Sequence, residues 1–196
     1  MAGWAIAVMR HPAPLGVDRR VSAALAVDTR WQDAGLRLLR LEGPATVAVV
    51  AVVLAAVAAG VGAVRLGAAI AGGVAAEIVS VQWVLKPLVG RHELAPGWSF
   101  PSSSVGAVTA LAAATVLLCR PAGPIGRRLT RPAALALSAG VVIVGVADVA
   151  VVATAAIATG GHLFSDVVAV VPWAVALPVA SHELLASGGP DAARCR

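Results

Sequence analysis

The chain has 196 residues, of which 59% are hydrophobic and 13% are charged, and its mean hydropathy is +0.89. A soluble domain of this length needs more polar surface to cover its core, and here the apolar residues stand in long unbroken blocks. These features exclude an ordinary soluble globular domain and predict a single-domain membrane protein. The net charge is +5, but the arginines flank the apolar blocks, so we expect them to contact lipid headgroups and not nucleic acid.

Residues 1–44 have a mixed composition and are predicted to form an N-terminal interfacial segment. Residues 1–9 are apolar but too short to cross a bilayer. Further along, arginines alternate with Trp31 and several leucines, a pattern typical of a helix that lies in the membrane interface. A solvated lead-in is the alternative interpretation. Gly43 and Pro44 end this segment and begin the next helix.

Five apolar blocks follow, each long enough for a transmembrane helix. We therefore predict an all-α, polytopic bundle over residues 45–180 and a polar tail over 181–196. The predicted spans are residues 45–64, 66–85, 102–119, 132–158 and 163–180.

Two acidic residues, Glu77 and Asp148, fall inside the second and fourth blocks. An ionisable group at membrane depth costs on the order of 2.5–3.5 kcal/mol, so it normally faces a partner or a cavity. A proton path and a polar contact with a partner subunit are the functional interpretations. The structural interpretation is a protonated carboxyl bonded to a neighbouring helix, including a bond between the two acids.

The charges of the connecting segments predict an orientation. Counting spans, Arg65, the 120–131 loop and the tail share one face, whereas residues 86–101 and the turn at His162 share the other. The 120–131 loop has four arginines and no acid, which favours the cytoplasm, so Lys86 and His162 are expected outside it. Six N-terminal arginines fall on that same outer face, against the rule. The short loop carries more weight because the N-terminal stretch is expected to lie along the membrane.

Two short segments on the outer face could bind an anion. Lys86 and Arg91 stand in a glycine-containing loop that can curl both cations around one ligand; anchoring at lipid headgroups is the alternative. Ser102, Ser103 and Ser104 open the next helix, where free N–H groups and the helix dipole favour an anion. An ordinary N-cap is the alternative there.

The third segment carries His162 and Asp166, four residues apart. If residues 162–166 begin a helix, the carboxylate reaches the imidazole and fixes its tautomer. The other ring nitrogen is then free to act as a nucleophile or a base. A purely structural histidine at a helix start is the alternative.

In order and spacing, these segments resemble the three motifs of the type 2 phosphatidic acid phosphatase superfamily, which includes the vanadium haloperoxidases. LKPLVGR at 85–91 is similar to the first motif, FPSSS at 100–104 to the start of the second, and GHLFSDVVA at 161–169 to the end of the third. The resemblance covers about residues 66–180. It implies a helical bundle that usually has six spans, so the first span is here missing or reduced to residues 1–9.

The resemblance also implies a mechanism. His162 would attack phosphorus and form a phosphohistidine, with Asp166 orienting it. Lys86, Arg91 and the N–H groups at Ser103 and Ser104 would hold the phosphoryl oxygens. The substrates would be lipid or polyprenyl phosphates and diphosphates at the cell membrane, and neither a metal nor another cofactor is expected.

The sequence departs from the family pattern at three places. Ser104 replaces the general-acid histidine of the second motif, Glu93 and Leu94 replace the Arg-Pro of the first, and Ala155 and Ala156 replace the Ser-Arg of the third.

These departures leave two functions open. A general acid typically contributes about 10²–10⁴-fold in rate, and His92 is an alternative donor in the first-motif loop. The chain is then either an active lipid phosphate phosphatase or a catalytically impaired relative. The impaired relative would bind a lipid phosphate or serve as a subunit in a membrane complex, with a second copy of the chain or another membrane protein as its partner.

Overall fold

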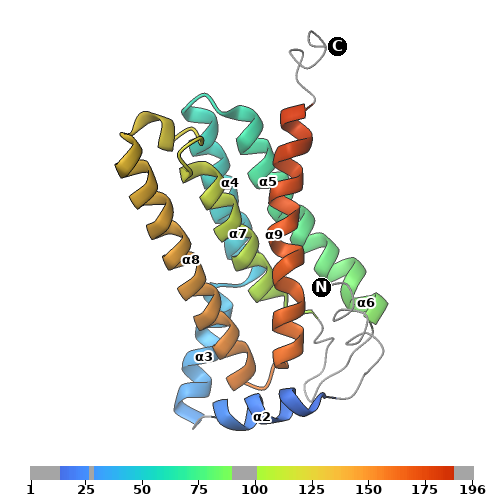
Figure 1. Cartoon of the computed structure of the whole chain (residues 1–196). Helices are drawn as coiled ribbons and strands as arrows, with labels where there is room; N and C mark the ends of the chain where they lie inside the picture. The colour runs from blue at the N-terminus through green and yellow to red at the C-terminus, as the bar shows by residue number, and fades with distance from the viewer. Residues whose placement is uncertain (1–13, 27–28, 90–100, 188–196) are drawn as a thin grey trace.

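The computed structural model describes residues 14–26, 29–89 and 101–187, and in these ranges the chain forms helices and turns without a β-strand (Figure 1). The predicted all-α class is confirmed for this part of the chain. In chain order the elements are α2 (Gly16–Leu25), α3 (Thr29–Leu41), α4 (Pro44–Gly60), α5 (Val64–Val79), the π-helical turn η1 (Ser80–Leu85), α6 (Lys86–Val89), α7 (Ser103–Cys119), the 3-10 turn η2 (Gly126–Arg128), α8 (Arg131–Ala158) and α9 (Phe164–Ser187).

Three of the described helices are long and apolar enough to cross a membrane: the continuous helix Val64–Val89, α8 and α9. A fourth span results if α3 and α4, which meet at a bend of 41°, are counted as one broken helix. Pro44 at the start of α4 explains the break, because proline favours the first turn of a helix and cannot continue one. The 17 residues of α7 are apolar but fall short of the same length.

Close helix packing places the core between α5, α7 and α9. α5 packs against α4, α7 and α9, and α7 also packs against α8. Small residues make these approaches close: a Cβ added at Gly73 would lie 2.6 Å from the Pro178 Cα, and one at Gly67 would lie 2.6 Å from the Ala55 carbonyl oxygen. Glycine at such positions lets two helix backbones come together.

The π-helical turn η1 interrupts the helix between α5 and α6. Its first residue, Ser80, donates a hydrogen bond to the Glu77 carbonyl oxygen over 3.0 Å and accepts one from the Trp173 indole N–H over 2.9 Å. Turns of this kind insert one residue into the regular winding and often occur at functional sites. Here the turn lies directly before Lys86 and ties that part of the helix to α9.

The N-terminal segment forms two helices at one end of the bundle. α2 lies across the lower end in Figure 1, where it contacts α8 and α9, and α3 packs along α8. With 28 residues, α8 is about 42 Å long, which exceeds a hydrocarbon core of about 30 Å. α8 is therefore long enough for the end that packs against α3 to extend beyond the apolar layer.

The helix α9 continues to Ser187, into the stretch that the sequence predicts to be a polar tail. The stretch Ser181–Ser187 includes Glu, Leu and Ala, which favour helix as readily in water as in lipid. The fall in hydropathy after residue 180 marks the end of the apolar surface and not the end of the helix. Residues 188–196 of the predicted tail lie outside the described residues.

The arginine-rich end of the bundle is held together by hydrogen bonds. Arg128 donates from Nη2 to the Val61 carbonyl oxygen over 3.1 Å, and Arg120 Nη2 lies 2.9 Å from His182 Nε2, which accepts the bond. The 120–131 loop, the turn before α5 and the end of α9 therefore share one end, as the span count predicts. The starts of α7 and α9 and the end of α6 lie at the other.

Candidate functional site

The three predicted segments come together at the second end of the bundle, as far as the described residues reach. Lys86 Nζ donates a hydrogen bond to Ser103 Oγ over 3.4 Å, which links α6 to α7. The Ser102 backbone N–H donates to the Asp166 carbonyl oxygen over 3.5 Å, which links α7 to α9. The lysine, the serine cluster and the segment of His162 and Asp166 are therefore neighbours in space.

Lys86 is a buried cation that faces a neutral group. It follows η1 at the start of α6, and its side chain is 9% exposed. Among the described residues, its hydrogen-bonding partner is the Ser103 hydroxyl and not a carboxylate. A buried charge without a counter-charge is costly, so this position favours the binding of an anion.

The start of α7 differs from an ordinary capped helix. Ser102 occupies the N-cap position, as predicted, but its side chain makes no capping hydrogen bond. Ser102 is 0% exposed, and its Oγ has no hydrogen-bond partner among the described residues. An N-cap side chain normally accepts from the N–H of the second or third helical residue, here Ser104 or Val105; without that bond, the first-turn N–H groups, including those at Ser103 and Ser104, are left for another acceptor.

The start of α9 lies within one residue of the predicted span, which begins at residue 163. α9 begins at Phe164, because Gly160, with a positive φ of 74°, and Gly161 turn the chain there. His162 precedes the helix, and its backbone N–H donates to the Ala156 carbonyl oxygen over 3.1 Å. Asp166 lies in the first turn of α9, as predicted.

Asp166 holds the segment that follows the histidine. It is 0% exposed, and its Oδ2 accepts a hydrogen bond from the Leu163 backbone N–H over 2.9 Å. This bond joins an acid in the first helical turn to the backbone just before the helix, as in one half of a capping box. Asp166 thus fixes the backbone next to His162.

Asp18 lies at the same end of the bundle as the candidate site and was not predicted from the sequence. It lies on α2 with 0% exposure and accepts hydrogen bonds from the Ser165 N–H at 2.8 Å, the Ser165 hydroxyl at 3.0 Å and the Leu15 N–H at 2.8 Å. An acid at the start of α9 also suits the helix dipole. Asp18 precedes Ser165 by 147 residues, so no local pattern links the two. The one feature of the sequence that could have drawn attention to Asp18 is an acid within a basic, amphipathic stretch.

Several predicted positions fall outside the described residues or carry no charge. Arg91, His92, Glu93 and Leu94 lie in the range 90–100, which the structure does not describe. Ala156, where the third motif of the family has arginine, is 0% exposed and packs in the core, so a methyl group occupies that place. Within the described ranges, no group of three or more His, Cys, Asp or Glu side chains could hold a metal ion.

Glu77 and Asp148 are not bonded to each other, so that part of the prediction is wrong. Glu77 is 0% exposed between α5, α7 and α9, and neither of its carboxyl oxygens has a hydrogen-bond partner among the described residues. One of these oxygens lies directly against Gly106 of α7. Asp148 is exposed on α8.

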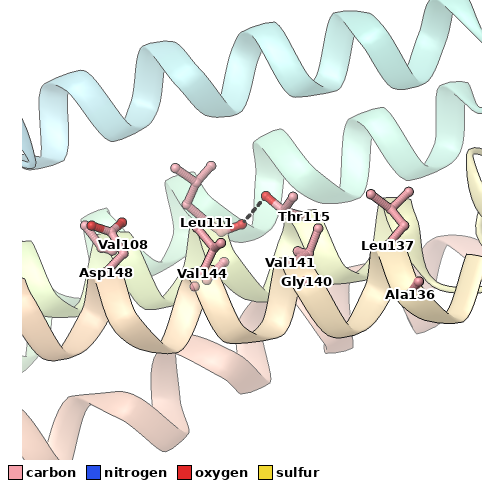
Figure 2. A pocket seen from close by; sticks show the side chains of 11 residues that line it. Val108, Leu111, Thr115, Ala136, Leu137, Gly140, Val141, Val144 and Asp148 are labelled. Atoms are coloured by element: carbon pink, nitrogen blue, oxygen red, sulfur yellow. Dashed lines mark hydrogen bonds between the residues drawn. The ribbon is translucent and has the colours of Figure 1, made fainter.

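Asp148 lies in a separate groove of about 510 Å³ between α7 and α8 (Figure 2). The walls are mainly aliphatic, with Asp148 near one end, and the Thr115 hydroxyl is bonded to the Leu111 carbonyl oxygen over 2.8 Å. Apart from Asp148, none of the predicted site residues that the structure describes lines this groove. Its apolar walls suit a hydrocarbon chain better than a phosphate.

Comparison with known proteins gives no match to a family model, to a curated protein or to a solved structure.

Proposed function

We propose that the chain is a multi-pass membrane protein of the type 2 phosphatidic acid phosphatase superfamily that acts on a lipid or polyprenyl phosphate or diphosphate. The observation that supports this proposal best is the hydrogen bond between Lys86 and Ser103 at the start of α7. It brings a buried cation to a helix N-terminus, two groups that favour the same phosphoryl oxygens. The bond between Ser102 and Asp166 adds the segment of His162.

The proposed membrane arrangement has five spans: the bent pair α3–α4, Val64–Val89, α7, α8 and α9. The 17 residues of α7 are about 25 Å long, close to the hydrocarbon thickness of about 30 Å. The arginine-rich end would face the cytoplasm by the positive-inside rule. The end with Lys86 and His162 would then lie at the extracytoplasmic face of the cell membrane.

The proposed reaction has two steps. A ring nitrogen of His162 attacks phosphorus, a nitrogen–phosphorus bond forms, and the bond from phosphorus to the leaving oxygen breaks. Water then attacks the phosphohistidine, and the nitrogen–phosphorus bond breaks to release phosphate. Lys86 and the N–H groups at Ser103 and Ser104 stabilise the charge on the phosphoryl oxygens, and Asp166 orients the backbone beside His162. Arg91, from the resemblance alone, would add a second cation.

Phosphate release by the purified protein tests this proposal. We expect release from phosphatidic acid and from farnesyl diphosphate by the wild type, and loss of that release in His162→Ala. His182→Ala is a matched control, because His182 lies at the arginine-rich end and bonds to Arg120. Acid-labile phosphate bound to the wild-type protein after rapid quenching would support the phosphohistidine. Equal, negligible release by the wild type and His162→Ala would refute the activity.

A catalytically impaired relative is the second candidate, and the core position of Ala156 favours it. The wild type would then bind a lipid phosphate in a Lys86-dependent way without turnover, alone or within a membrane complex. The double substitution Ser104→His with Ala156→Arg would restore the family residues and should create turnover. Rapid turnover by the wild-type chain would exclude this candidate.

A further inference from the structure

The buried carboxyl of Glu77 is not explained by the site described so far. Its two oxygens have no hydrogen-bond partner among the described residues, and the side chain is 0% exposed. It sits where α5, α7 and α9 meet, against Gly106 of α7 and close to Val170 of α9. Any side chain at position 106 would collide with the carboxyl, so the glycine provides the space that Glu77 occupies.

A second unpartnered polar group lies next to Glu77 along α7. The Ser102 hydroxyl is also buried and without a partner in the described part of the chain. Ser102 and Gly106 are joined by the first hydrogen bond of α7, from the Gly106 N–H to the Ser102 carbonyl oxygen over 3.0 Å, so they lie on one face. Ser102 therefore stands about 6 Å along the helix axis from the glycine against which the Glu77 carboxyl lies, so a proton would pass between the two side chains directly or through one water molecule.

Within the described part of the chain, the charged groups around Glu77 leave it without a counter-charge. No charged residue occurs in α4 or α7. On α9 the first-turn acid, Asp166, accepts a hydrogen bond from Leu163, and on α6 Lys86 donates to Ser103. An ionised carboxylate in this apolar place would be costly, whereas a neutral carboxylic acid fits it and carries a proton that can be given away.

We propose that Glu77 stores the proton that the leaving group needs and delivers it through the Ser102 hydroxyl, in place of the histidine that Ser104 replaces. When the bond from phosphorus to the leaving oxygen breaks, that oxygen takes the proton of Ser102, and Ser102 takes the proton of Glu77. When water attacks the phosphohistidine, its proton returns through Ser102 to the Glu77 carboxylate. The inference rests on the proposed hydrolysis, and it names the proton source of that reaction.

The nature of the leaving group tests this inference. Phosphatidic acid has an alkoxide leaving group that needs a proton, whereas p-nitrophenyl phosphate has a leaving group that departs without one. We expect Glu77→Gln to lower phosphate release from phosphatidic acid by about 10²–10⁴-fold, the usual contribution of a general acid, and to leave release from p-nitrophenyl phosphate nearly unchanged. Glu183→Gln, at an exposed position of α9, should change neither rate.

Comparing the two substrates on one protein preparation separates a chemical role from a structural one, because any loss of folded protein lowers both rates equally. An equal loss on both substrates, or no loss, would overturn the role of Glu77 while the proposed hydrolysis stands. A selective loss in His92→Gln with none in Glu77→Gln would assign the proton to His92 and also overturn it. If the wild type releases phosphate from neither substrate, the proposed hydrolysis fails and the inference fails with it.

Infrared spectroscopy provides a readout that does not need turnover. The wild type should show the C=O band of a protonated, buried carboxyl that shifts in D₂O. The band should disappear in Glu77→Gln, stay in Glu183→Gln and change frequency in Ser102→Ala. A wild-type spectrum without such a band would show that Glu77 holds no proton and would overturn the inference.

Discussion

Asp18 and Lys86 are both buried charged residues near the same end of the bundle, yet their surroundings differ. Asp18 accepts three hydrogen bonds from Ser165 and Leu15, so its charge is compensated within the protein. Lys86 has a neutral hydroxyl as its partner. Asp18 is therefore expected to hold α2 against α9, whereas Lys86 is expected to hold a ligand.

Replacing Asp18 should lower the stability of the folded protein. Asp18→Asn exchanges an acceptor oxygen for an N–H₂ group beside the donors of Ser165, so we expect the free energy of unfolding to fall by about 1–3 kcal/mol. Asp33→Asn, at an exposed position of α3, is the matched control and should stay within about 0.5 kcal/mol. Thermal unfolding in detergent measures both. Equal melting temperatures for the two variants would contradict the role of Asp18.

Replacing Lys86 should have the opposite effect on stability. Exchanging a buried, uncompensated charge for an apolar side chain of similar size is often neutral or stabilising, so Lys86→Met should melt at the same or a higher temperature. The phosphate analogue orthovanadate should raise the melting temperature of the wild type and not that of Lys86→Met. Arg65→Met, an exposed cation at the other end, should keep the vanadate shift. A shift retained in Lys86→Met would place the anion elsewhere.

At the scale of elements, glycines set how closely the helices approach. Gly73→Ala would place a Cβ 2.6 Å from the Pro178 Cα, and backbone on both sides leaves little room to yield. We expect a loss of about 1–3 kcal/mol in the free energy of unfolding, typical of overpacking. Gly72→Ala, whose Cβ would meet nothing within 4 Å, should be neutral or slightly stabilising. Reversed melting temperatures would show that α5 and α9 do not pack as described.

Much of the helical framework can be predicted from the apolar blocks. In lipid, the backbone N–H and C=O groups of each block must form their hydrogen bonds within the block, and a continuous helix achieves this. The blocks at 45–64 and 132–158 match α4 and α8 within a few residues. The π turn η1 and the extension of α9 to Ser187 are not readable, since hydropathy reports where lipid begins and ends and not how the backbone winds. The break at Pro44 was readable from Gly43 and Pro44.

The candidate site was only partly readable from the sequence. Alternation of loops between the two ends predicts that Lys86, Ser103 and Asp166 share one end, and their hydrogen bonds agree with this placement. The absence of a side-chain cap at Ser102 was not predictable, because it depends on how α7 meets α9. Asp18 was not predictable either, since its partner is remote in the chain.

At the scale of the whole molecule, orientation can be tested with two matched leucines. Leu88 is 71% exposed at the end with Lys86, and Leu129 is 42% exposed at the arginine-rich end. After replacement of Cys119 and Cys195, a membrane-impermeant thiol reagent added to intact cells should label Leu88→Cys and not Leu129→Cys. Permeabilised cells should show labelling of both variants. The reverse pattern would place the candidate site in the cytoplasm.

The π turn at Ser80–Leu85 makes the direction of Lys86 depend on the number of residues before it. Each residue of a regular helix advances the chain by about 100°. Deletion of one residue within the turn would restore regular winding and leave the lysine close to its present direction, whereas insertion of one further residue would rotate it away from Ser103 by about 100°. The molecule should therefore tolerate a turn shorter by one residue better than a turn longer by one, a difference in phase that no substitution scan would reveal.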